Sequence, residues 1–263
     1  MTETGTDNSS DALRPLLIRP GEGGLRRNQL IDPRPGLVRA DVEDDMHRFT
    51  VEIEHDGTFV TDFRAEALRW PWSTCPLAAT HLSQRMKGAR LAALAEVDSP
   101  YSHCTHMHDL TLLAAAHALD DAPTLYSCFA SDETEPTQHA ELYCNGQREI
   151  VWELRDSVIV SPGPRQGLSL RKLKVWEADL SPVERERARV LRRAVFISGG
   201  RGFSYDVVPT ADLIPQSVGA CFTFQPERSP QAACTMDVRD YRDGPAPLAE
   251  RIAQVAQERG LAG

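Results

Sequence analysis

Several sequence signatures of common protein classes are missing from this chain. It contains no glycine-rich nucleotide-binding motif, neither G-x-G-x-x-G nor the P-loop pattern, and no G-x-S-x-G motif of serine hydrolases. Its longest apolar run, residues 110–119, is interrupted by Thr111 and His117 and is too short to span a bilayer. These absences argue against dinucleotide-dependent hydride transfer, against phosphoryl transfer and against a membrane span.

Positive charge and paired cysteines are also scarce. Lys and Arg number 29 against 38 Asp and Glu, which gives a formal net charge of −9, and no basic cluster stands out. Such a balance repels a phosphate backbone, so we expect no nucleic-acid partner. The six cysteines form no C-x-x-C pair, which is typical of reduced and mostly buried thiols. Because residues 1–11 contain no apolar signal segment, we expect a cytoplasmic protein without a membrane partner.

The remaining composition is that of a globular protein, with 41% hydrophobic residues. We expect residues 1–12 to form a disordered tail and residues 13–263 a single domain, with 13–122 and 123–263 as alternative halves. Strands and helices do not alternate as β-α-β units, so the pattern predicts an α+β fold with a mainly antiparallel sheet and a few packed helices. Strands are predicted at 47–54, 59–66, 124–131, 140–143, 149–160 and 218–225, and helices at 76–86, 104–118, 181–195 and 246–259.

The clearest local prediction is a β-hairpin over residues 47–66. Residues 47–54 and 59–66 both alternate, and Asp56-Gly57 supplies a turn between them. The alternation places His47 on the same face as Phe49, and that face is apolar. A helix that covers this face would meet His47.

Chemically reactive residues concentrate between positions 75 and 117. Five of the eight histidines fall there, together with two cysteines and an aspartate: His81, His103, His106, His108, His117, Cys75, Cys104 and Asp109. On the helix predicted at 104–118, His106 and Asp109 share one face. At 1.5 Å per residue His117 lies roughly 16 Å from His106, so the two cannot share one metal ion.

These residues allow more than one kind of chemistry. A zinc or other divalent metal site would join His106 and Asp109 or Cys104 to the distant His47 and Cys75. Without a metal, His106 beside Asp109 would act as acid or base, because the helix N-terminus favours its neutral form. The same dipole would favour a nucleophilic thiolate at Cys104.

An inert interpretation stands beside these two. Cys75 and Cys104 would then be packing residues, which is the commonest state of a buried cysteine. We expect His117 to be structural, with a buried imidazole that bonds a backbone carbonyl. Trp72, next to Cys75, is a core residue or the wall of a substrate pocket for an aromatic or acyl group.

Three stretches resemble a bacterial family catalogued as a domain of unknown function, number 2889. They read DDMHRFTVEIEHDG, the Cys-Pro at positions 75–76, and CTHMHDLTLLAAAHA. The family motif usually reads Cys-Thr-His-Leu, where this chain has Met107, and commonly has Gly where this chain has His103, so no shared role is assigned to His103. The resemblance covers about residues 25–240, and it implies a bacterial protein of aromatic or acyl catabolism rather than a defined activity.

Two functions follow from these observations. The first is an enzyme of lyase or hydrolase type that acts on an apolar aromatic or acyl compound. Its catalytic residues would be His47, Cys104, His106 and Asp109, and its substrate contacts Trp72 and Cys75. The second is a non-catalytic protein that binds a small molecule or a partner. The first requires His47 and His106 to lie within about 12 Å of each other. The sequence leaves the substrate and the oligomeric state open.

Overall fold

The computed structural model describes residues 23–132, 136–202, 207–235 and 237–261. They form two compact units. The first contains residues 23–28, 124–202 and 241–261, and the second contains residues 29–123 and 207–240 apart from the undescribed position 236. Each unit is therefore assembled from segments that are distant in the sequence. The tail predicted at residues 1–12 lies outside the described residues.

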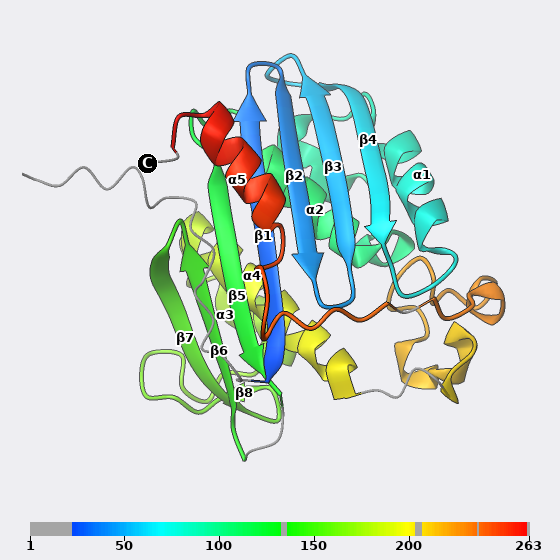
Figure 1. Ribbon diagram of the computed structural model, residues 1–263, viewed down its shortest axis with the longest axis vertical. Coiled ribbons are helices and arrows are strands. Elements are labelled where there is room, and N and C mark those ends of the chain that lie inside the picture. Colours follow the sequence, from blue (N-terminus) through cyan, green and yellow to red (C-terminus); the bar gives the residue numbers. More distant parts are fainter. Residues whose placement is uncertain (1–22, 133–135, 203–206, 236, 262–263) are drawn as a thin grey trace, which may run out of the picture. The chain divides into compact units, whose positions relative to one another are not determined.

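The predicted α+β fold with an antiparallel sheet is confirmed (Figure 1). The strand order is β4-β3-β2-β1-β5-β6-β7-β8, and β1 contributes residues to both units. The strands are β1 Gly24–Arg34, β2 Leu37–Asp44, β3 Arg48–His55, β4 Val60–Arg69, β5 Thr124–Ser131, β6 Gln138–Cys144, β7 Gln147–Arg155 and β8 Val158–Ile159.

The helices agree closely with those predicted, apart from one short addition. They are α1 Cys75–Met86, α2 Thr105–Ala116, α3 Leu173–Glu177, α4 Pro182–Ser198 and α5 Ala249–Glu258. Ser181 caps α4 through a capping box with Glu184. Short 3-10 helices lie at Leu91–Glu96, Pro100–Ser102, Leu170–Lys172, Gly199–Gly202, Ala211–Leu213, Pro215–Ser217 and Ser229–Gln231.

In the second unit, α1 and α2 cover the apolar face of β2, β3 and β4 (Figure 1). The predicted hairpin is present, with Val51 opposite Ala65 and Gly57 at the turn with φ 92°. The β2–β3 register sets Val42 opposite Phe49, and both side chains are buried. The hydrophobic face therefore runs unbroken to the end of the sheet where β2 turns into β3.

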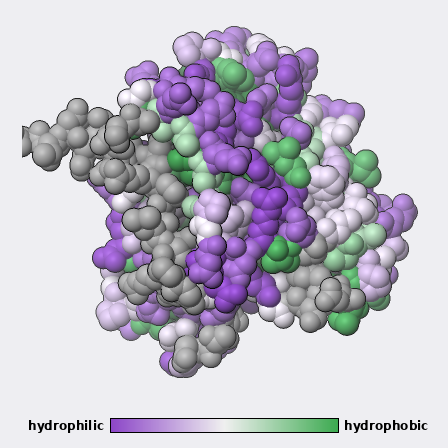
Figure 2. Space-filling model, viewed as in Figure 1, coloured by the Kyte–Doolittle hydropathy of each residue, from purple (hydrophilic) through white to green (hydrophobic). Residues whose placement is uncertain are grey.

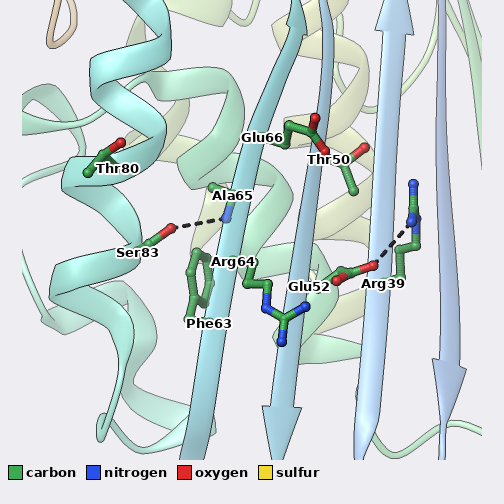
Figure 3. A pocket seen from close by; sticks show the side chains of 9 residues that line it. All are labelled: Arg39, Thr50, Glu52, Phe63, Arg64, Ala65, Glu66, Thr80 and Ser83. Atoms are coloured by element: carbon green, nitrogen blue, oxygen red, sulfur yellow. Dashed lines mark hydrogen bonds and ion pairs between the residues drawn. The ribbon is translucent and has the colours of Figure 1, made fainter.

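The opposite face of these strands is charged (Figures 2 and 3). Arg39, Glu52 and Arg64 stand in cross-strand register, and Arg39 pairs with Glu52 at 3.1 Å. A hollow of about 500 Å³ lies over β2, β3 and β4 on this side, and Thr80 and Ser83 of α1 complete its lining. At its margin the Oγ of Ser83 accepts a hydrogen bond from the backbone N–H of Ala65, so α1 satisfies a donor of the edge strand.

In the first unit, α4 packs against β5, β6 and β7. The strand predicted at 149–160 is two strands, because Asp156 and Ser157 adopt positive φ values of 51° and 63° and turn the chain. Asn145 and Gly146 form the predicted turn between β6 and β7, both with positive φ.

The strand predicted at 218–225, in the second unit, is wrong. Gly219 has φ 76°, and the N–H of Phe224 turns back to the carbonyl of Cys221, so this segment is a series of turns. It contacts the residues just before α2 through the bond from the Phe222 N–H to the His103 carbonyl and through the bond from the Gln225 side-chain amide to the Tyr101 carbonyl. Aromatic and β-branched composition predicted a strand where turns are required.

Candidate functional site

The structure brings His47 and His106 together. Their ring centroids are 4.0 Å apart and their planes are inclined by 33°. His47 immediately precedes β3 and contacts Phe49, with centroids 5.6 Å apart, while His106 lies in the first turn of α2 and meets the same phenyl ring edge-on at 6.0 Å. The prediction that the two histidines converge across 59 positions is confirmed.

Asp44 completes the group. The Nδ1–H of His47 donates to Asp44 Oδ1 at 2.9 Å, and the backbone N–H groups of Met46 and His47 donate to the same oxygen at 2.9 and 2.8 Å. Asp44 is fully buried, His47 is 8% exposed and His106 is half-buried. Asp44, His47 and His106 each offer one ligand atom, and these atoms lie within 4.8 Å of one another.

The local sequence explains this arrangement. Asp44 is the last residue of β2 and follows Val42 on the apolar face, just as His47 precedes Phe49 on that face. The chain must reverse between them, and an aspartate that accepts hydrogen bonds from N–H groups two and three residues ahead stabilises such a turn. The same side chain therefore shapes the turn and points its charge at His47.

The hydrogen bond determines what His47 can do. A buried carboxylate accepts hydrogen bonds, so the proton lies on Nδ1 and the lone pair on Nε2. A carboxylate-oriented imidazole is the arrangement of a general base and also of a metal-ligating histidine. Two imidazoles and one carboxylate are ligands that zinc and other divalent transition metals accept.

Cys104 does not have the environment of a nucleophile. It is the N-cap residue of α2, as expected, but it is 6% exposed and burial raises the pKa of its thiol well above its usual range. Burial therefore opposes the thiolate that the helix dipole would favour, which supports the inert interpretation of Cys104. Asp109 is half-buried on α2 and is not one of the three residues of the cluster.

Trp72 and Cys75 belong to a different part of the second unit. They lie in an apolar cluster with Val208, Ala211, Ile214 and Ala232. Trp72 meets Phe224 edge-on, with centroids 5.8 Å apart, and burial raises the pKa of Cys75 to about 12. Both side chains are less than 7% exposed, so the structure places them in packing rather than on an open wall.

The other histidines of α2 fall outside the cluster. His117 is the C-cap residue of α2, where its Nδ1 lies 2.6 Å from Asp120 Oδ2, and its ring is half-buried rather than buried as predicted. His103 stacks with His108, with ring centroids 5.5 Å apart, and its ring is tilted by 40° to that of His81 at a centroid distance of 5.2 Å. No group of three metal-ligating residues other than Asp44, His47 and His106 is found in the described residues.

Asp44 is the member of this cluster that the sequence analysis did not predict. A signal was present, because Asp44 and His47 form a D-x-x-H pattern directly before an alternating strand. Recognising it requires β2 to be identified as the partner of β3, and the sequence predicts no strand before residue 47.

Comparison of the sequence with protein-family models and with curated proteins finds no match. The resemblance to family 2889 therefore stays a prediction. None of the helices in the described ranges is both long and apolar enough to cross a bilayer.

Proposed function

We propose that Asp44, His47 and His106 form a divalent-metal centre, and that the protein is a small-molecule lyase or hydrolase that uses it. The observation that carries the proposal is the convergence of one ligand atom from each residue within 4.8 Å. Three protein ligands are the usual complement of a catalytic zinc site, because they leave positions for water and substrate. Structural sites instead use four.

The environment of the three residues suits this role. The carboxylate of Asp44 is held by two backbone N–H groups, so its position does not depend on a bound ion. His106 is the most accessible of the three, so a substrate would reach the centre most easily beside its ring. The Phe49 ring beside both imidazoles gives them an apolar surrounding, which is consistent with an aromatic or acyl substrate.

A bound ion would supply a Lewis acid and a water whose pKa falls to near 7. The protein would supply one negative charge from Asp44 and two neutral donors. The rings now stand 4.0 Å apart, whereas two imidazoles on one tetrahedral zinc stand about 5 Å apart. Binding one ion between the two imidazoles would therefore require their ring centroids to move apart by about 1 Å.

One observation favours a second candidate, a metal-free acid–base pair. The 2.9 Å bond from His47 to Asp44 already orients an imidazole as a general base, and His106 lies against it. A non-catalytic binding protein is the third alternative. Measurements of metal binding and of ester cleavage distinguish the metal centre, the acid–base pair and the binding protein.

The test begins with elemental analysis of the purified protein and with titration of chelator-treated protein with Zn²⁺ and Co²⁺. We expect stoichiometric binding by the wild type and a loss of at least about tenfold in affinity in Asp44→Asn and His106→Gln, with His139→Gln as the matched control. Hydrolysis of p-nitrophenyl acetate, a generic ester, should follow metal loading. Equal metal affinity in wild type and His106→Gln would overturn the metal centre. Ester cleavage that persists without metal but is lost in His47→Gln would establish the acid–base pair.

A further inference from the structure

Arg69 is a buried arginine at the end of β4, and its guanidinium group reaches the turn that carries Asp44 and His47. The side chain is only 6% exposed. It donates hydrogen bonds to the backbone carbonyls of Asp44, of Asp45 at 2.6 Å and of His47 at 3.4 Å. Its Nη2 also lies 3.3 Å from a carboxylate oxygen of Glu43.

The same guanidinium joins the turn to a distant part of the chain. Arg69 Nη1 donates to the carbonyl of Asp237 at 3.2 Å. The backbone N–H of Arg239 donates to the Asp45 carbonyl at 2.8 Å, and Arg239 Nη1 lies 3.5 Å from the Glu43 carboxylate. Residues 237–239 and β4 therefore hold the turn from two directions.

The chemistry of arginine suits this position. A guanidinium group is planar and carries five N–H donors, so one side chain can satisfy several carbonyls that point into the same buried space. Lysine has a single head group and cannot span them. Carbonyls left without these donors would lose hydrogen bonds in a place that water does not easily reach.

We propose that Arg69 is the positioning residue of the Asp44–His47–His106 centre. It fixes the backbone at the two turn residues that supply a ligand and touches neither the ion nor a substrate. This inference rests on the proposed function for its effect on metal affinity. A site held to within about 0.5 Å by its supporting residues binds its ligand far better than one whose supports are loose.

The test compares Arg69→Lys and Arg69→Met with Arg64→Met, a control on the same strand whose side chain is 68% exposed. The first readout is Co²⁺ affinity, followed by the visible absorption of the bound ion. We expect affinity to fall by about 10- to 100-fold in both Arg69 variants and to stay unchanged in Arg64→Met. The second readout is amide hydrogen exchange of Met46 and His47 without metal, normalised to amides of β6.

Exchange at Met46 and His47 should accelerate in Arg69→Lys while β6 stays protected, because the defect is local. Wild-type affinity and wild-type exchange in Arg69→Lys would overturn the inference. If the wild type binds no Co²⁺, the metal centre fails, and the exchange measurement alone decides whether Arg69 holds the turn. If Arg69→Met does not fold, Arg69→Lys carries both readouts. Uniform acceleration in the turn and in β6 would show a general loss of stability and would contradict the positioning role.

Discussion

The imidazole of His103 is fully buried and stacks on that of His108, with ring centroids 5.5 Å apart and planes inclined by 12°. The His81 ring lies 5.2 Å from the His103 ring between centroids, and Asp98 Oδ2 is 3.4 Å from His103 Nε2. Asp98 is itself paired with Arg85 at 2.8 Å. The buried ring therefore lies among two further imidazoles and a carboxylate that is already paired with an arginine. The protein consequently stabilises the protonated form of His103 poorly.

This environment predicts a loss of stability in acid. Burial, reinforced by repulsion from His108 and His81, lowers the pKa of His103 from 6.5 to about 4. Between these values the unfolded chain binds a proton that the folded chain does not, so the free energy of unfolding falls as the pH drops from 6.5 toward 4. The shift corresponds to at most about 3 kcal/mol. Urea unfolding at pH 7 and at about pH 4.5 measures it.

The control is His103→Leu, which removes the titrating group. Its free energy of unfolding should change less between the two pH values than that of the wild type, whatever its absolute stability. An identical acid-dependent loss in both proteins would assign the effect to other groups.

A second prediction concerns helix α4. Ser181→Ala removes the hydroxyl that accepts a hydrogen bond from the Glu184 N–H, and with it half of the capping box. The free energy of unfolding should fall by about 1 kcal/mol. Chemical denaturation measures the loss, and Ser181→Asp should recover most of it, because an aspartate also caps a helix N-terminus. A loss that Ser181→Asp does not recover would mean that the hydroxyl acts elsewhere.

Part of the site was predictable because strand geometry has a period of two. Once residues 47–54 were identified as a strand, His47 had to share the face of Phe49, and an apolar helix had to cover that face. Asp44 was not predictable in the same way. Its role depends on the pairing of β2 with β3, which is a long-range fact about register rather than a local pattern.

Cys104 shows which property of a site residue the sequence does not predict. Its position at the start of α2 is local and was predicted, whereas its burial depends on the packed structure, in which Cys75 and the distant Cys221 both lie close enough to act on its thiol. Helix dipoles can be inferred from sequence, but desolvation needs the packed structure. The same limit applies to the turns at 218–225, whose contacts lie far along the chain.

A third prediction concerns alkylation by iodoacetamide at pH 7. Cys104, Cys75 and Cys128 are buried, and burial raises the pKa of each thiol, to about 12 for Cys75 and Cys128. They should react more slowly than the half-buried Cys234, as followed by mass spectrometry of labelled peptides. Chelator should not change the rate at Cys104. Rapid labelling there, or labelling only after chelation, would restore a catalytic or metal-binding role.

The last prediction separates two histidines of one helix. His117→Asn loses the 2.6 Å contact with Asp120 at the C-terminus of α2, where half-buried surface pairs contribute little, so the free energy of unfolding should fall by roughly 0.5–1 kcal/mol. Zn²⁺ affinity should stay at the wild-type value, because the cluster lies at the other end of the helix. His106→Asn should do the reverse, with a large loss of Zn²⁺ affinity at little cost in stability. Isothermal titration calorimetry measures the Zn²⁺ affinity of both variants, and chemical denaturation measures their free energy of unfolding. A loss of Zn²⁺ binding in a folded His117→Asn variant would place His117 in the site.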